Sequence, residues 1–123
     1  MAVIPATIKD IGEQDGSVKI ISWAQAAVGD LVSDSVELPQ WGDRSVQFTA
    51  TTWGTGSVSL EGSNDGVVFL PLYDPNGIVI TATANKLEQV LEITRYVRVQ
   101  WTIAPTSVGT ITLLARRANP MRA

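Results

Sequence analysis

The sequence predicts an all-β protein, namely a single antiparallel β-sandwich, jelly-roll-like, with about eight short strands. Apolar and polar residues alternate in short runs, which is typical of strands that bury one face. Gly, Asn, Asp and Pro separate these runs and favour turns. The chain has 123 residues, 45% of them hydrophobic, which suits one domain with one hydrophobic core.

No sustained period marks residues 1–16, so we expect an extended N-terminal arm there. The β-sandwich domain is expected over residues 17–117, and a C-terminal tail over residues 118–123. Within the domain, the first strands are predicted at residues 18–23 and 31–38.

Residues 44–52 and 57–61 alternate in the same way, and each run has one apolar face. Residues 53–56, Trp-Gly-Thr-Gly, lie between them and have the composition of a hairpin turn. The sequence therefore predicts a β-hairpin over residues 44–61.

Two tight turns are predicted next, at residues 62–66 (Gly-Ser-Asn-Asp-Gly) and 74–77 (Asp-Pro-Asn-Gly). Strands are expected after them, at residues 67–73 and 78–83. Pro71 has no N–H to donate to a sheet, so the first of these strands is expected at an edge or at a bulge.

Residues 86–93 place their apolar side chains at helical spacing, but the run is too short for a stable helix. We interpret it as a connector with at most one helical turn. Residues 95–103 and 110–116 alternate cleanly, and the short segment 105–109 joins them. A second hairpin is therefore predicted near the C-terminus.

Cysteine and histidine are both absent, which excludes most hydrolase designs, because imidazole and thiolate are the usual bases and nucleophiles. We expect no enzyme activity, no cofactor and no metal. Asp65 and Asp74 could offer oxygens to calcium, but the spacing of an EF-hand loop is missing, so turns are favoured. A small hydrolase using paired carboxylates is disfavoured.

No apolar run approaches a membrane span of roughly 18 residues, and the first residues lack the pattern of a signal peptide. We therefore expect no membrane partner. The net charge of −3 disfavours nucleic-acid binding, which needs clustered basic residues.

Charge is unevenly distributed along the chain. All 12 acidic residues occur at or before Glu92, whereas every charged residue after Glu92 is basic. This asymmetry has two interpretations, which are solvated surface strands or a polarised, self-complementary contact between subunits. The basic residues after Glu92 are Arg95, Arg98, Arg116, Arg117 and Arg122.

The chain has four tryptophans, and Trp101 is expected in the core. Trp41 and Trp53 lie beside glycines in predicted turns, where an indole could be exposed to a partner. Packing over the end of the sandwich is the alternative for both.

Several motifs resemble small structural proteins encoded among the head and tail genes of tailed bacteriophages. They are Asp-Arg-Ser-Val-Gln at residues 43–47, Leu-Glu-Gly-Ser-Asn-Asp-Gly at 60–66, Asp-Pro-Asn-Gly at 74–77 and Arg-Tyr-Val-Arg at 95–98. The resemblance covers residues 20–117, and Pro71 departs from it. It implies a decoration or cement protein on the capsid surface of the virion, made in the host cytoplasm. Such proteins often form trimers and reinforce contacts between major capsid subunits.

Our hypothesis for the protein interface combines the arm, the tail and a basic face. Its candidate residues are Ile4, Ile8, Trp41, Trp53, Arg95, Arg98, Arg116, Arg117 and Arg122. The alternative function is a tail or baseplate β-sandwich for host or carbohydrate attachment, in which Trp41 or Trp53 would stack on sugars.

Overall fold

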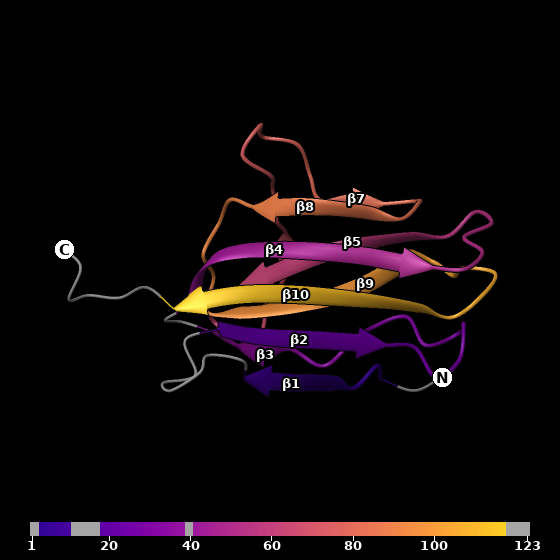
Figure 1. Ribbon diagram of the computed structural model, residues 1–123, viewed down its shortest axis with the longest axis horizontal. Helices are drawn as coiled ribbons and strands as arrows, with labels where there is room; N and C mark the ends of the chain where they lie inside the picture. Colours follow the sequence, from indigo (N-terminus) through magenta and orange to yellow (C-terminus); the bar gives the residue numbers. More distant parts are fainter. Residues whose placement is uncertain (1–2, 11–17, 39–40, 118–123) are drawn as a thin grey trace.

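The protein is described by a computed structural model, which covers residues 3–10, 18–38 and 41–117. These residues form ten β-strands and no helix, in two antiparallel sheets that lie one behind the other (Figure 1). The front sheet in Figure 1 contains, in spatial order, β1 (Ala6–Asp10), β2 (Val18–Ala24), β10 (Gly109–Arg117), β4 (Trp41–Ala50) and β8 (Lys86–Val90).

The rear sheet contains, in spatial order, β3 (Val36–Glu37), β9 (Tyr96–Ile103), β5 (Ser57–Ser63) and β6 (Leu70–Pro71), and β7 (Thr81–Ala82) also pairs with β5. The all-β prediction is confirmed, and the two layers have the arrangement of a sandwich. The jelly-roll topology stays a prediction.

The core lies between the sheets. In the front sheet, Ile21, Leu113 and Val46 are directly opposed on neighbouring strands and are fully buried. In the rear sheet, Leu60 and Val99 are opposed in the same way and equally buried. These inward rows belong to one continuous hydrophobic cluster, as the alternation predicts.

Both predicted hairpins are wrong. β4 belongs to the front sheet and β5 to the rear sheet, and β9 and β10 are divided in the same way. Each connection therefore passes from one sheet to the other as an arch, and the two strands that it joins do not pair with each other. Period-two alternation places an apolar face on each strand, but it does not tell whether the two faces lie side by side or opposite each other.

The two arches pack together at one end of the sandwich. Thr52 N donates to Ser107 Oγ at 2.7 Å, and Ser107 N donates to the Thr52 carbonyl oxygen at 3.0 Å. The Trp53 and Trp101 rings lie 5.4 Å apart between their centroids. A Cβ on Gly56 would lie 2.8 Å from Pro105 Cα, so this close approach requires glycine.

Residues 86–90, expected in a connector with at most a helical turn, instead form the edge strand β8, paired with β4. The inward positions of β8 include Lys86 and Glu88, opposite the buried Phe48 and Val46. Because these inward side chains are charged, the strand lacks the apolar alternation by which it could have been predicted.

Other predicted strands are shorter than expected. Only Val36–Glu37 of the 31–38 run, Leu70–Pro71 of the 67–73 run and Thr81–Ala82 of the 78–83 run are strands. Pro71 lies in β6, at the edge of the rear sheet, as predicted from its missing N–H.

The predicted N-terminal arm is wrong where the structure describes it, because Ala6–Asp10 is strand β1, paired with β2. Just before it, Ile4 forms a bridge with Ser33. Ser33 N donates in turn to the Val99 carbonyl oxygen of β9, so the segment runs from beside the rear sheet into the front sheet. Residues 11–16 of the arm and the whole predicted tail lie outside the described residues.

The turn predicted at residues 74–77 is confirmed. The turn predicted at residues 62–66 is found at 64–67, because Gly62 and Ser63 still belong to β5. Asp65 Oδ1 accepts from Val67 N and Val68 N and from Ser63 Oγ, and these bonds lower the pKa of its carboxyl to about 2. Asp74 Oδ1 likewise accepts from Asn76 N and Ile78 N. The two carboxylates therefore stabilise their own turns.

Candidate interaction surface

Three of the candidate arginines form ion pairs within the chain. Arg95 Nε lies 2.6 Å from Glu37 Oε2, and Arg98 Nε lies 2.9 Å from Glu61 Oε1. In the third pair, Arg116 Nη2 lies 2.6 Å from Asp43 Oδ2. The charges that are segregated along the sequence are thus neutralised in space at these positions.

The predicted basic face does not form from these three residues. Arg95 and Arg98 belong to the rear-sheet strand β9 and its approach, whereas Arg116 belongs to β10 in the front sheet. Arg98 also stacks over the Phe69 ring, at 4.2 Å from its centroid, and Arg95 lies over Tyr96. Their contacts fit a solvated, locally paired surface.

The remaining candidates are divided among the core, the surface and the undescribed part. Trp53 packs on Trp101, and its Nε1 donates to Asn85 Oδ1 at 2.8 Å, so it packs over the end of the sandwich. Ile4 is fully buried, which contradicts its assignment to an exposed arm. The side chains of Trp41 and Arg117, and all of Arg122, lie outside the described residues.

Five exposed apolar side chains belong to β6, to β8 and to the segments next to them. These elements form one side of the sandwich, where β7 and β8 are labelled in Figure 1. We call this side the β8 flank. Its exposed members are Leu70, Tyr73, Ile78, Leu87 and Leu91.

Backbone hydrogen bonds hold the β8 flank together across the two sheets. Leu72 N donates to the Leu60 carbonyl oxygen of β5, while Leu91 N, just after β8, donates to the Tyr73 carbonyl oxygen. Glu92 Oε1 accepts from Tyr73 N at 2.7 Å. The segment after β6 therefore bridges the rear sheet to the front sheet and presents its apolar side chains on a fixed backbone.

Leu87 is 68% exposed and Ile78 is 61% exposed, although residues of this type are usually buried. Single exposed apolar residues are ordinary, whereas large contiguous apolar patches are typical of protein contact surfaces. The arrangement can bury apolar area against a partner without a conformational change.

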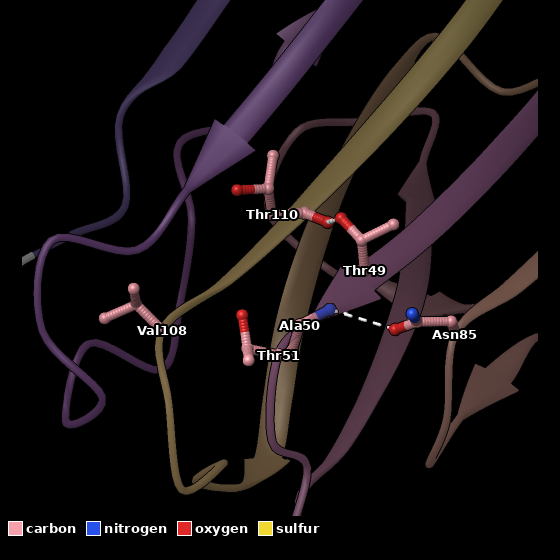
Figure 2. A pocket seen from close by; sticks show the side chains of 6 residues that line it. All are labelled: Thr49, Ala50, Thr51, Asn85, Val108 and Thr110. Atoms are coloured by element: carbon pink, nitrogen blue, oxygen red, sulfur yellow. Dashed lines mark hydrogen bonds between the residues drawn. The ribbon is translucent and has the colours of Figure 1, made fainter.

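A shallow hollow of about 440 Å³ lies near the arches. Figure 2 shows the residues that line it, which are Thr49, Ala50, Thr51, Asn85, Val108 and Thr110. Its polar groups bond to one another: Asn85 Oδ1 accepts from Ala50 N at 3.0 Å, and Thr49 Oγ1 donates to the Thr110 carbonyl oxygen. The hollow therefore lies where β4 ends and β10 begins, and these polar groups already have hydrogen-bond partners.

Within the described ranges, no group of three or more acidic side chains is placed to hold a metal ion. The same residues include no helix with the length and apolarity needed to span a membrane.

The fold has a solved counterpart. The chain is similar to the SPBc2 prophage-derived protein YomS, with a TM-score of 0.58 and 9% identity over 80% of this chain and 93% of that one. A weaker likeness, with a TM-score of 0.36 and 14% identity, is to the K1 cleaved adhesin domain of Lys-gingipain from Porphyromonas gingivalis W83, over 93% of this chain and 90% of that one. No protein-family model and no curated protein matches the chain.

The sequence did not predict the β8 flank. Ile78 begins a run that is predicted as a strand, whereas Leu87 and Leu91 belong to the predicted connector, and neither pattern indicates exposed apolar side chains. Pro71 was the one signal, because it indicated an edge of the sheet in this region.

Proposed function

We propose that this chain is a non-enzymatic structural protein of a tailed-phage particle, and that it binds the assembled capsid as a decoration protein. In this role it reinforces contacts between major capsid subunits on the surface of the virion. The β8 flank carries the proposal, because its apolar side chains are exposed and held on hydrogen-bonded backbone. Such a surface gains free energy when a partner subunit covers it.

Two further observations support this role. The fold is shared with a prophage-derived protein, which fits a phage origin. The two-layer body provides a fixed platform, so that little conformational entropy is lost on binding.

Cosedimentation with capsid shells tests the proposal. The shells are assembled from the major capsid protein of the same virus, and the wild-type chain is expected to pellet with them. The double variant Ile78→Asp/Leu91→Asp should bind at least about tenfold more weakly, because central apolar contacts carry most of the binding free energy. Both side chains are exposed, so folding should be retained.

Val108→Asp is the matched control, since Val108 is also exposed but lies at the arch end of the sandwich. This variant should bind like the wild type. A wild-type chain that does not bind shells would refute the decoration role, and a flank variant with unchanged binding would refute the assignment of the surface. Specific glycan binding without shell binding would support the attachment function instead.

A further inference from the structure

Asn76 and Gly77 are the exposed end of the turn that precedes β7, and Figure 1 shows the chain leading into β7 as a loop at the top of the view. Asparagine is chemically labile at its side-chain amide. It is most labile before glycine, because glycine has no Cβ to keep its backbone nitrogen away from the amide carbon. Of the four asparagines in the chain, Asn76 alone precedes glycine.

Deamidation at this pair needs no reagent other than water. The Gly77 backbone nitrogen attacks Asn76 Cγ, its proton passes through water to the amide nitrogen, and ammonia leaves from the resulting succinimide ring. Water then opens the ring at either carbonyl carbon, which gives aspartate or isoaspartate. The ring can close only when rotation about the Cα–C bond of Asn76 brings the Gly77 nitrogen to Cγ.

Hydrogen bonds of the turn oppose this rotation. Gly77 N, the attacking atom, donates to the Asp74 carbonyl oxygen at 2.9 Å. Asn76 N and Ile78 N donate to Asp74 Oδ1 at 2.9 and 3.0 Å. Asp74 N donates to the Ile78 carbonyl oxygen at 2.9 Å. The peptide units on both sides of Asn76 are therefore fixed.

The backbone angles of the turn keep the reacting atoms apart. Among the described residues other than glycine, only Asp43 has a positive φ, so φ of Asn76 is negative, whereas φ of Gly77 is +80°. With the bond from Gly77 N to the Asp74 carbonyl oxygen, this is the pattern of a type I turn followed by a left-handed glycine. The third residue of such a turn has ψ of about 0°. The Gly77 nitrogen therefore lies toward the main-chain nitrogen of Asn76 and away from its side chain.

We propose that Asn76 is a deamidation site that the turn protects, and that Asp74 is the positioning residue that sets its rate. Asp74 is 8% exposed, and each of the turn's hydrogen bonds has an Asp74 atom as donor or acceptor. Deamidation would place a carboxylate beside Ile78 on the β8 flank, or insert a methylene group into the main chain there as isoaspartate. The inference concerns the turn itself and does not depend on what the β8 flank binds.

Mass spectrometry of proteolytic peptides measures the rate, after incubation at mildly alkaline pH and a temperature below unfolding. In the folded wild-type chain, Asn76 should react at least about tenfold more slowly than in the same chain unfolded in guanidinium chloride, because the turn must open locally before the ring can close. Asn85, which precedes lysine, is the internal reference and should stay unmodified in both samples.

Substitution of Asp74 tests its role separately. Asp74→Ala removes two main-chain hydrogen bonds to a carboxylate and should raise the rate at Asn76 by at least about fivefold. Asp74→Asn keeps an acceptor oxygen and should stay close to the wild type.

Asp65→Ala is the matched control, since it removes a carboxylate that also accepts two main-chain bonds, but at the other turn. The rate at Asn76 should be unchanged in this variant. Circular dichroism checks that each variant is folded.

Equal rates at Asn76 in the folded and unfolded wild-type chains would overturn the proposed protection, and this comparison needs no variant. An Asp74→Ala variant with the wild-type rate would overturn the role of Asp74, as would equal acceleration by Asp65→Ala. None of these readings uses shell binding, so this proposal and the decoration role can fail independently.

Discussion

Arg44 lies in the inward row of β4 and is almost fully buried. Its Nη2 donates to the Leu38 carbonyl oxygen at 2.6 Å and to the Thr94 carbonyl oxygen at 2.8 Å. Burial lowers the pKa of the guanidinium to about 10, so the side chain is charged at neutral pH. It thereby joins two connecting segments of the rear sheet to the front sheet.

Replacing Arg44 by Met should lower the free energy of unfolding by about 2–4 kcal/mol, because two buried carbonyl groups lose a charged donor. Urea denaturation followed by tryptophan fluorescence measures the change. Arg44→Lys keeps the charge and should cost less. A Met variant within about 0.5 kcal/mol of the wild type, the usual range for neutral surface changes, would contradict this role.

Asp65 gives a pH-dependent prediction. Its carboxylate accepts backbone hydrogen bonds from Val67 and Val68, and these lower its pKa to about 2. Because the pKa is lower in the folded chain than in the unfolded chain, the carboxylate stabilises the fold above pH ~4, and this stabilisation is lost as the pH falls toward 2.

Asp65→Asn keeps an acceptor oxygen but removes the charge. Its melting temperature should therefore be lower than that of the wild type at pH 7, and the difference should shrink between pH 4 and pH 2. Thermal unfolding at several pH values measures this. A difference that is constant over that interval would show that the charge of Asp65 has no stabilising role.

At the scale of the element, the arches show what the pattern of residues could and could not predict. Alternation located the long strands β4, β5, β9 and β10 within a few residues. It did not assign them to sheets, because a strand facing the core from the front has the same period as one facing it from the rear. The contacts that decide between them are long-range, such as those between Thr52 and Ser107.

The packing of the arches predicts the effect of a single methyl group. A Cβ on Gly56 would meet Pro105 Cα at 2.8 Å and the Trp53 carbonyl oxygen at 2.9 Å, and both are backbone atoms. Gly56→Ala should therefore lower the free energy of unfolding by about 1–3 kcal/mol. Chemical denaturation provides the measurement.

Gly29→Ala is the matched control, because a Cβ there would meet no atom within 4 Å. That change should be neutral or slightly stabilising, since alanine has fewer unfolded conformations than glycine. Equal effects of the two substitutions would contradict the close packing of the arches.

Short strands and charged edges set the limit of prediction at this scale. β3, β6 and β7 have two residues each, too few to show a period. β8 has Lys86 and Glu88 at inward positions, where apolar residues are usual, and the apolar Leu87 at an exposed position. The same property that made β8 hard to predict protects that edge from unwanted pairing.

At the scale of the whole molecule, the sequence shows that acidic and basic residues are segregated along the chain. It does not show which of them form ion pairs. The pairs of Arg95 with Glu37 and of Arg98 with Glu61 join residues far apart in the chain, so their neutralisation depends on the fold. Of the predicted interface residues with described side chains, Ile8 alone is exposed and forms neither an ion pair nor a ring contact with other described residues. The interaction surface that we propose is instead centred on exposed apolar residues of the β8 flank.

Cryo-electron microscopy of the particle whose genome encodes this chain tests the central claim most directly. We expect density for the two-layer body on the outside of the capsid, with Ile78 and Leu91 of the β8 flank against major capsid subunits. Density for the chain only in the tail or baseplate, or a flank facing solvent on the shell, would contradict the account.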